Sequence, residues 1–119
     1  MHAQELIKRY DEGERDFDKA DLTGADLAGA NLKGINLYEA SLVAANLREA
    51  DLLGANLEGA DLWKANMKGA ILAEADLREA NLRETMLQGA DLRGAKLAGA
   101  IMPDGKRKRL FTRLKEFTG

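Results

Sequence analysis

Residues 20–34 read ADLTGADLAGANLKG, which is one five-residue unit written three times. The unit places a small apolar residue first, Asp or Asn second, Leu at the centre, a variable residue fourth and Gly last. Aligned in this way, sixteen units follow one another from Ala20 to Gly99 without an insertion. A repeat of this length decides the fold, because each unit has to form the same local structure.

The unit is kept most strictly at its centre. The central residue is Leu in fifteen units, and the first residue is Ala in fourteen, with Ile35 and Thr85 as exceptions. The second residue is Asp or Asn in twelve units, and the last is Gly in nine and Glu in five. We expect the central residues to form the structural core: Leu22, Leu27, Leu32, Leu37, Leu42, Leu47, Leu52, Leu57, Leu62, Met67, Leu72, Leu77, Leu82, Leu87, Leu92 and Leu97.

A period of five excludes both continuous regular structures. In an α-helix five residues turn the chain by about 500°, so successive leucines would point to every side. The nine glycines would also destabilise a helix interior by about 1 kcal/mol each. In a continuous strand, residues five apart point to opposite faces.

The pattern is satisfied if each unit forms one short extended wall followed by a corner. The first and central residues, two positions apart, then both point inward, while the second and fourth residues point outward. Gly suits the corner because a positive φ angle is accessible to it without strain. Each unit is therefore one wall of a tube.

The run from Ala20 to Gly99 resembles the pentapeptide-repeat family. The resemblance implies an all-β solenoid, a right-handed quadrilateral β-helix in which four walls complete a coil. Sixteen units then make about four coils, stacked to a length of about 20 Å. Because a solenoid is stabilised by contacts between neighbouring coils, its two ends need caps, and we expect short N- and C-terminal capping helices.

Residues 1–16 are expected to form an N-terminal helical cap. Leu6, Ile7 and Tyr10 are spaced as one helical face, so we predict a helix from Ala3 to Glu12 that covers the first coil.

The helix is followed by Gly13, a stop signal. Phe17 stands five residues before Leu22 and is expected to be an early central residue of the β-helix, which we assign to residues 17–104. The leader ELIKRYDEGERDF, residues 5–17, resembles that of cyanobacterial members of the family.

The repeat is expected to end after Met102, where Pro103, Asp104 and Gly105 form a turn. The stretch IMPDG resembles the way cyanobacterial members close their repeat. Residues 105–119 are then assigned to a basic amphipathic helix, whose apolar face supplies the candidate tail contacts Leu110, Phe111, Leu114 and Phe117. We expect this helix to cap the tube. The alternatives are a homodimer through this helix, as in some gyrase-targeting members, and attachment to an anionic membrane or nucleic acid, which we do not expect.

The composition is that of one folded domain of modest size. The 119 residues are 45% hydrophobic and 32% charged, with a formal net charge of −2. There is no cysteine, which excludes disulfides and thiolate metal sites, and His2 is the single histidine. Because the N-terminus is charged and no apolar run reaches about 18 residues, we expect a cytoplasmic protein from which nothing is removed.

Catalytic motifs are not evident in the sequence. A nucleophilic triad needs a positioned histidine, and His2 lies at the chain start. Neither a zinc cluster nor a phosphate-binding loop is present. Stacked Asp and Asn side chains, such as Asp21 and Asp61, could hold a cation, but we expect them to bond to nearby backbone. We therefore predict no enzymatic activity, catalytic residues, metal site or cofactor.

The outward positions suggest a binding surface. Stacking in steps of twenty puts Thr23, Val43, Trp63 and Arg83 in one column, and Lys33, Leu53, Ala73 and Arg93 in another. Val43, Leu53 and Trp63 are the candidate protein-binding residues, because aromatic and large apolar anchors are enriched in interfaces. Ile71 and Met86, which replace Asp or Asn, are expected to be exposed as well. The alternative is that these are scattered surface residues.

The expected function is a non-enzymatic scaffold with flat walls for an unidentified protein partner, and without a small-molecule substrate. One alternative, implied by the resemblance, is a DNA mimic that modulates a type II topoisomerase such as gyrase. Another is a designed consensus solenoid without a natural partner. The DNA mimic is disfavoured because a duplex of about 20 Å carries roughly twelve negative charges. The sixteen units hold twelve acids but also eight bases.

Overall fold

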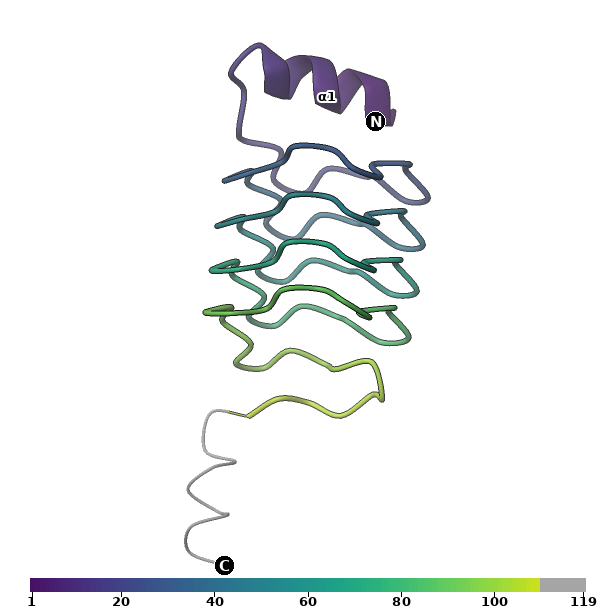
Figure 1. Cartoon of the computed structure of the whole chain (residues 1–119), viewed down its shortest axis with the longest axis vertical. Helices are drawn as coiled ribbons and strands as arrows, with labels where there is room; N and C mark the ends of the chain where they lie inside the picture. Colours follow the sequence, from purple (N-terminus) through teal and green to yellow (C-terminus); the bar gives the residue numbers. More distant parts are fainter. Residues whose placement is uncertain (110–119) are drawn as a thin grey trace, which may run out of the picture.

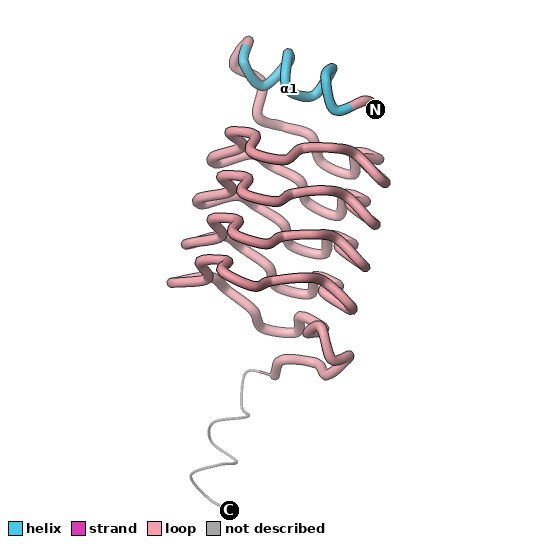
Figure 2. The backbone as a smooth tube through the Cα atoms, turned by 45° about the vertical axis from the view of Figure 1, so that its right-hand side comes forward, coloured by secondary structure: helices cyan, strands magenta, loops and turns pink. Residues whose placement is uncertain are grey.

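A helix and a stack of coils make up the computed structural model of the chain, which describes residues 1–109 (Figure 1). The helix, α1 (Ala3–Asp11), lies over the N-terminal end of the stack. The coils contain no extended strand within residues 1–109 (Figure 2). Each wall contributes one residue to isolated parallel bridges.

The bridges recur every five residues from Asp16 to Ile101, and each joins a residue to the one twenty positions later. Four units therefore complete each coil. Eighteen walls are bridged, which makes four and a half coils. The stack thus extends beyond the sixteen units of the sequence by one wall at each end.

Neighbouring coils are joined by three backbone hydrogen bonds per wall. In the first coil the Leu22 amide donates to the Ser41 carbonyl at 2.8 Å, and the Gly24 amide donates to the Val43 carbonyl at 2.8 Å. In return the Ser41 amide donates to the Ala20 carbonyl at 2.9 Å. The same three bonds recur down the stack, so the backbone polar groups of inner coils are satisfied.

We name the four walls by their bridging residues. Wall A carries Asp21, Ser41, Asp61, Asn81 and Ile101; wall B carries Asp26, Asn46, Asn66 and Met86; wall C carries Asn31, Asp51, Ile71 and Asp91; and wall D carries Asp16, Asn36, Asn56, Asp76 and Lys96. Because the walls follow one another around a four-sided coil, A lies opposite C and B lies opposite D.

The interior of the tube is filled by the central residues, as predicted. From Leu22 to Leu82, Met67 included, they are at most 1% exposed. Leu87, Leu92 and Leu97 differ from the prediction, because they are only partly buried. They lie in the last coil, and no further coil within residues 1–109 covers them.

The corners hold residues with positive φ angles, and not only glycines. Gly54 has φ +66°, but Glu49 and Lys64 adopt φ angles of 60° and 59°. Eight residues other than glycine share this conformation: Lys19, Glu39, Ala44, Glu49, Lys64, Glu74, Glu79 and Glu84. A left-handed residue with a Cβ costs about 1–2 kcal/mol, so the stacking of coils overrides the local preference at these corners.

Four of these glutamates stand one coil before a glycine in the same corner. The pairs are Glu39 with Gly59, Glu49 with Gly69, Glu74 with Gly94, and Glu79 with Gly99. A Cβ atom on Gly59 would lie 3.0 Å from the Cγ atom of Glu39. A Cβ atom at Gly59 would therefore need the Glu39 side chain to shift, in addition to the strain of a positive φ angle.

Helix α1 covers the N-terminal end through Leu6 and Tyr10, which are 0% and 6% exposed. The Tyr10 hydroxyl donates to the Lys33 carbonyl at 2.6 Å, which ties the helix to the first full coil. The predicted face included Ile7, which is wrong: Ile7 is 36% exposed. Residues one apart are separated by about 100°, so Leu6 and Ile7 cannot both face the coil.

The start of the first wall is fixed by Phe17. The Phe17 side chain is 3% exposed, and its amide donates to the Asn36 carbonyl at 2.9 Å. Phe17 is thus the first central residue of wall D, as predicted. Gly13, with φ +103°, ends the helix as its sequence position indicated.

At the C-terminal end the chain reverses after Met102. The Met102 amide donates to the Lys106 carbonyl at 2.8 Å, and Ile101 forms an antiparallel bridge with Arg107. The helix predicted for residues 105–119 therefore does not begin within 105–109, because these residues satisfy open backbone groups of the last coil. The rest of that helix lies outside the described residues, as do the candidate contacts Leu110, Phe111, Leu114 and Phe117.

The stack predicts a large difference between two leucines that are four residues apart. Leu57 is 0% exposed and Leu53 is 40% exposed. Leu57→Ala should lower the free energy of unfolding by about 3 kcal/mol, because it leaves a cavity in the tube. Leu53→Ala should change it by no more than about 0.5 kcal/mol. Urea unfolding followed by circular dichroism measures both, and equal losses would contradict a core filled by the central residues.

The corner geometry predicts unequal effects of one substitution at two glycines. Gly54 and Gly59 have φ angles of +66° and +69°, but only a Cβ on Gly59 would meet Glu39. Gly54→Ala should destabilise by about 1–2 kcal/mol through φ strain alone. Gly59→Ala should destabilise more, and adding Glu39→Ala should remove the excess. Thermal unfolding of the four proteins is the measurement, and an undiminished excess in the double variant would refute the steric explanation.

Candidate functional site

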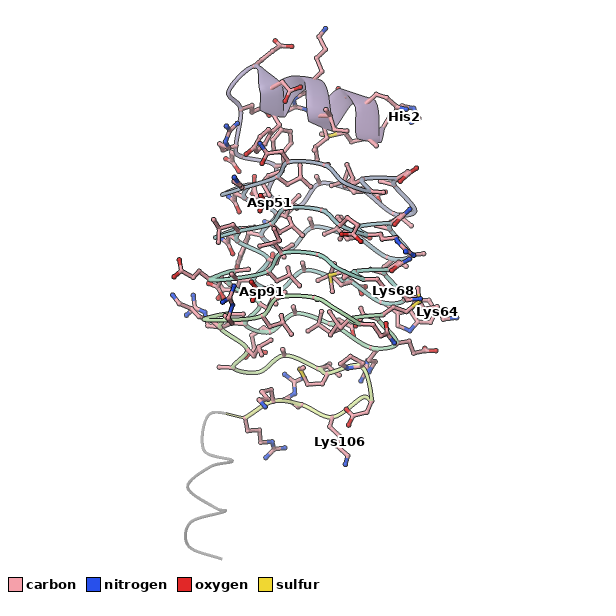
Figure 3. All side chains as sticks on the ribbon, in the orientation of Figure 1. His2, Asp51, Lys64, Lys68, Asp91 and Lys106 are labelled. Carbon is pink, nitrogen blue, oxygen red and sulfur yellow. The ribbon has the colours of Figure 1, made fainter. Side chains whose placement is uncertain are left out.

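The candidate protein-binding residues do not share one surface. Leu53 and Trp63 are 40% and 38% exposed, as predicted, whereas Val43 is half-buried. Val43 and Trp63 stand on wall A, and Leu53 stands on the opposite wall C. Figure 3 shows Asp51 of wall C on one side of the stack and Lys64, at the corner after wall A, on the other.

The outward Asp and Asn side chains bond to local backbone, as predicted. In the unit of Asp61, its Oδ1 atom accepts a hydrogen bond from the Trp63 amide at 3.2 Å. All twelve Asp and Asn residues at the second position of a unit accept in this way from the amide two residues later. Within residues 1–109 no group of three or more His, Cys, Asp or Glu is arranged to hold a metal ion.

Wall C carries an apolar patch at its middle. Ile71 is 38% exposed and forms the bridge with Asp51, one coil before it. Leu53 lies in the next outward column, and the Gly54 amide bonds to the Ala73 carbonyl, so Ala73 stands one coil after Leu53. We call Leu53, Ile71 and Ala73 the wall C patch. A shallow groove beside it is lined by Leu53, Ala73, Glu74, Arg93 and Gly94.

Ion pairs frame the wall C patch on both sides along the stack. The Lys33 Nζ atom lies 3.4 Å from the Asp51 Oδ2 atom. On the other side the Arg93 guanidinium donates to both carboxylate oxygens of Asp91, at 3.0 and 2.8 Å. The guanidinium and the Arg93 amide together lower the pKa of Asp91 to about 2. Lys33, Asp51, Asp91 and Arg93 are thus paired within the wall, whereas Glu74 lines the groove without an ion pair among residues 1–109.

Trp63 on wall A is held by its neighbours. Its indole N–H donates to the Glu84 Oε2 atom at 2.8 Å, and the Lys64 Nζ atom lies 4.5 Å from the ring centre. Glu84 and Lys64 both occupy corners beside this wall. The polar group of the indole therefore already has a partner, and only part of the ring is open to contact.

Sequence reasoning missed two features of the walls. It did not place Leu53 beside Ile71, which follows it by eighteen residues. At this separation, the fourth residue of one unit lies next to the second residue of a unit in the following coil. It also missed the Asp91–Arg93 and Asp76–Arg78 pairs. The signal for these pairs is the sequence Asp-Leu-Arg, because the second and fourth residues of a unit point to the same side.

Within residues 1–109, the structure contains no helix of sufficient length and hydrophobicity to cross a lipid bilayer.

The Asp91–Arg93 pair predicts a titration that can be measured. Its carboxyl pKa of about 2 lies below the ordinary value of 3.8, so the pair stabilises the fold above that ordinary value, and the contribution is lost as the pH falls toward 2. Arg93→Gln should move the pKa of Asp91 toward 3.8, but not fully, because the amide of residue 93 still donates. Arg83→Gln on wall A removes the same charge and should leave it unchanged. Carboxyl chemical shifts followed by NMR against pH distinguish the two results.

Comparison with known proteins agrees with this architecture. The family model of pentapeptide repeats matches residues 16–52, 35–72, 50–85 and 75–103. No curated protein matches the chain.

Several solved structures are similar. Rfr23, a pentapeptide repeat protein from the cyanobacterium Cyanothece 51142, is 40% identical over 68% of this chain and 58% of its own, with a TM-score of 0.58. The chain thus spans little more than half of the length of Rfr23. The pentapeptide repeat protein alr5209 from Nostoc PCC 7120 is 39% identical over 96% of this chain and 91% of its own, also at a TM-score of 0.58.

QnrB1, a plasmid-mediated fluoroquinolone resistance protein, is 25% identical over 73% of this chain and 45% of its own, with a TM-score of 0.64. These neighbours imply a right-handed quadrilateral β-helix. The chain belongs to the pentapeptide repeat family.

Proposed function

We propose that this chain is a non-enzymatic scaffold that binds another protein through wall C. The observation that carries the proposal is the exposed pair of Leu53 and Ile71 at the middle of a flat wall. Apolar side chains that adjoin on a rigid surface favour a protein contact, since their burial removes apolar area from water with little loss of conformational entropy.

Ile71 supports a role outside the fold itself. At the same position in twelve other units, the Asp or Asn side chain accepts a hydrogen bond from the amide two residues later. The Ile71 side chain has no acceptor and cannot form this bond with the Ala73 amide. The Ile71 side chain is 38% exposed, so its partial burial in the fold contributes little stability to replace the missing hydrogen bond. A partner that covers it supplies the missing burial.

Four charged side chains around the wall C patch are paired within the wall. Lys33 pairs with Asp51, and Arg93 pairs with Asp91, so these four charges are compensated within the wall. Such a border is typical of the polar rim of an interface, with the apolar residues at its centre.

The fold also supports a passive role. The inner coils are joined by repeated backbone bonds of 2.7–3.1 Å, and their central residues are fully buried. Buried side chains of the first and central positions occupy the interior of the tube. We propose, as a consequence, that the function lies on the walls.

The similarity to QnrB1 raises the second candidate, a DNA mimic acting on a type II topoisomerase. The ion pairs argue against it, because a mimic needs unpaired negative charge along its length. The Nη2 atom of Arg78 lies 2.6 Å from the Oδ2 atom of Asp76, and the Nη2 atom of Arg93 lies 2.8 Å from the Oδ2 atom of Asp91. Two of the outward carboxylates are therefore neutralised by bases in their own units.

Affinity capture from a lysate of the source organism tests the scaffold proposal. The full chain is compared with Leu53→Glu and Ile71→Glu, which place a charge in the wall C patch. A protein captured by the unchanged chain should be lost or weakened at least about tenfold with either variant, because burying an unpaired carboxylate opposes binding. Affinity of the identified partner is then measured by titration calorimetry.

Two matched variants serve as controls. Ala28→Glu adds the same charge to wall B, and Trp63→Lys changes the exposed aromatic residue of wall A. Both should leave the affinity within about threefold, since rim or remote substitutions contribute little. A partner lost with Trp63→Lys alone would move the binding surface to wall A. Equal loss with Ala28→Glu, or no specific partner for any version, would overturn the proposal.

A further inference from the structure

Wall B presents hydrogen-bond donors, and no carboxylate, on two successive coils. Asn46 and Arg48 are the outward residues of one coil. The bridge between Asn46 and Asn66 places Asn66 and Lys68 on the next coil. The Glu49 amide donates to the Lys68 carbonyl at 2.9 Å, so Arg48 and Lys68 are stacked in the same way. We call Asn46, Arg48, Asn66 and Lys68 the donor ladder.

The two asparagine side chains of the donor ladder are oriented by the backbone. The Oδ1 atoms of Asn46 and Asn66 each accept a hydrogen bond from the amide two residues later, at 3.1 Å. Their Nδ2 atoms have no acceptor among residues 1–109. On wall A, by contrast, the Asn81 Nδ2 atom donates to the Asp61 Oδ1 atom at 3.0 Å. The asparagines of wall B therefore keep donors available for a partner.

The two bases of the donor ladder are free to pair with a partner. On wall C, Arg93 pairs with Asp91 of its own unit. The units of Arg48 and Lys68 carry Asn in place of that Asp, and neither base forms an ion pair with a residue in 1–109. Lys64, at the corner before wall B, adds a third positive charge, and Figure 3 shows it on the same side of the stack as Lys68.

The donor ladder is narrow, and it ends at an exposed apolar residue. Met86 follows it by one coil on the same wall and is 36% exposed. Carboxylates stand at the other borders: Asp26 lies one coil before the ladder, and Glu49 and Glu84 occupy the corners on its two sides. A polyanion much wider than the wall would meet these carboxylates, which disfavours a membrane or a nucleic-acid duplex.

We propose that wall B binds an acidic helix of another protein, with two carboxylates against the donor ladder and an apolar side chain against Met86. Successive coils are about 4.8 Å apart. Side chains three or four residues apart on a helix are separated by about 5–6 Å, which matches this spacing. On one face of an extended segment the side chains are about 6.8 Å apart, which does not. The pattern Glu-x-x-x-Glu-x-x-Leu has the required spacing.

NMR titration of the isotope-labelled full chain with an alanine-based helical peptide of this pattern tests the proposal. The side-chain amide signals of Asn46 and Asn66 should shift. Arg48→Gln/Lys68→Gln should weaken the affinity at least about fivefold, since two ion pairs are lost, each of modest strength. An isomeric peptide with its two glutamates two positions apart, and so on opposite sides of the helix, should also bind at least about fivefold more weakly.

Matched variants separate the donor ladder from the net charge of the protein. Arg78→Gln/Arg93→Gln removes two positive charges from walls D and C, and Ile71→Glu adds a negative charge to the wall C patch. Both should leave the affinity for the peptide within about twofold in about 0.1 M salt, because remote charges are screened. The response to Ile71→Glu also keeps this test distinct from that of the scaffold proposal, which needs an intact wall C patch.

Four results would overturn the proposal. One is equal affinity for the isomeric peptide, which would indicate charge attraction without a matched spacing. Another is an equal loss of affinity with Arg78→Gln/Arg93→Gln. The third is a shift of the donor-ladder signals with octathymidylate or phosphatidylserine vesicles but not with the peptide, which would assign wall B to a nucleic acid or a membrane. The fourth is the absence of a shift with any of these probes.

Discussion

The hydrogen bond from each central amide to the carbonyl nineteen residues later is the interaction on which the fold depends. The Leu22 and Leu42 amides make it at 2.8 and 2.7 Å, and it recurs in every inner wall. It can form only if each coil has the same number of residues, so an insertion would shift all later walls. The same stacking aligns the leucines in columns, and the core and the backbone lattice therefore follow from one constraint.

This constraint leaves little freedom inside the tube and much of it outside. In the inner coils the first and central residues are buried, and corner residues must accept a positive φ angle even when they carry a side chain, as Glu49 and Lys64 do. The second position is used mainly for a bond to the local backbone. The fourth position meets no such demand, and Leu53 and Trp63 both occupy it. The surface can therefore vary while the scaffold stays the same, which is how a regular solenoid acquires individual binding surfaces.

The two ends of the stack are covered in different ways, because a terminal coil has a neighbouring coil on one side only. At the N-terminus, Leu6 and Tyr10 of α1 supply the contacts that a preceding coil would have given. At the C-terminus, residues 105–109 turn back and pair with the last wall, which satisfies one corner and leaves Leu92 and Leu97 partly buried. A single helix face closes the first end, whereas the chain reversal closes only part of the second.

The amino-acid sequence by itself determined the wall, the corner and the buried columns, because a five-residue period has one local solution that hides Ala and Leu. It also indicated the exposure of Leu53 and Trp63. It also placed these two residues in different columns. Only the tertiary structure decided that Leu53 adjoins Ile71 and that residues 105–109 reverse. These features depend on contacts between residues eighteen to twenty positions apart and on open backbone groups at the end of the stack. A five-residue pattern contains no information about either.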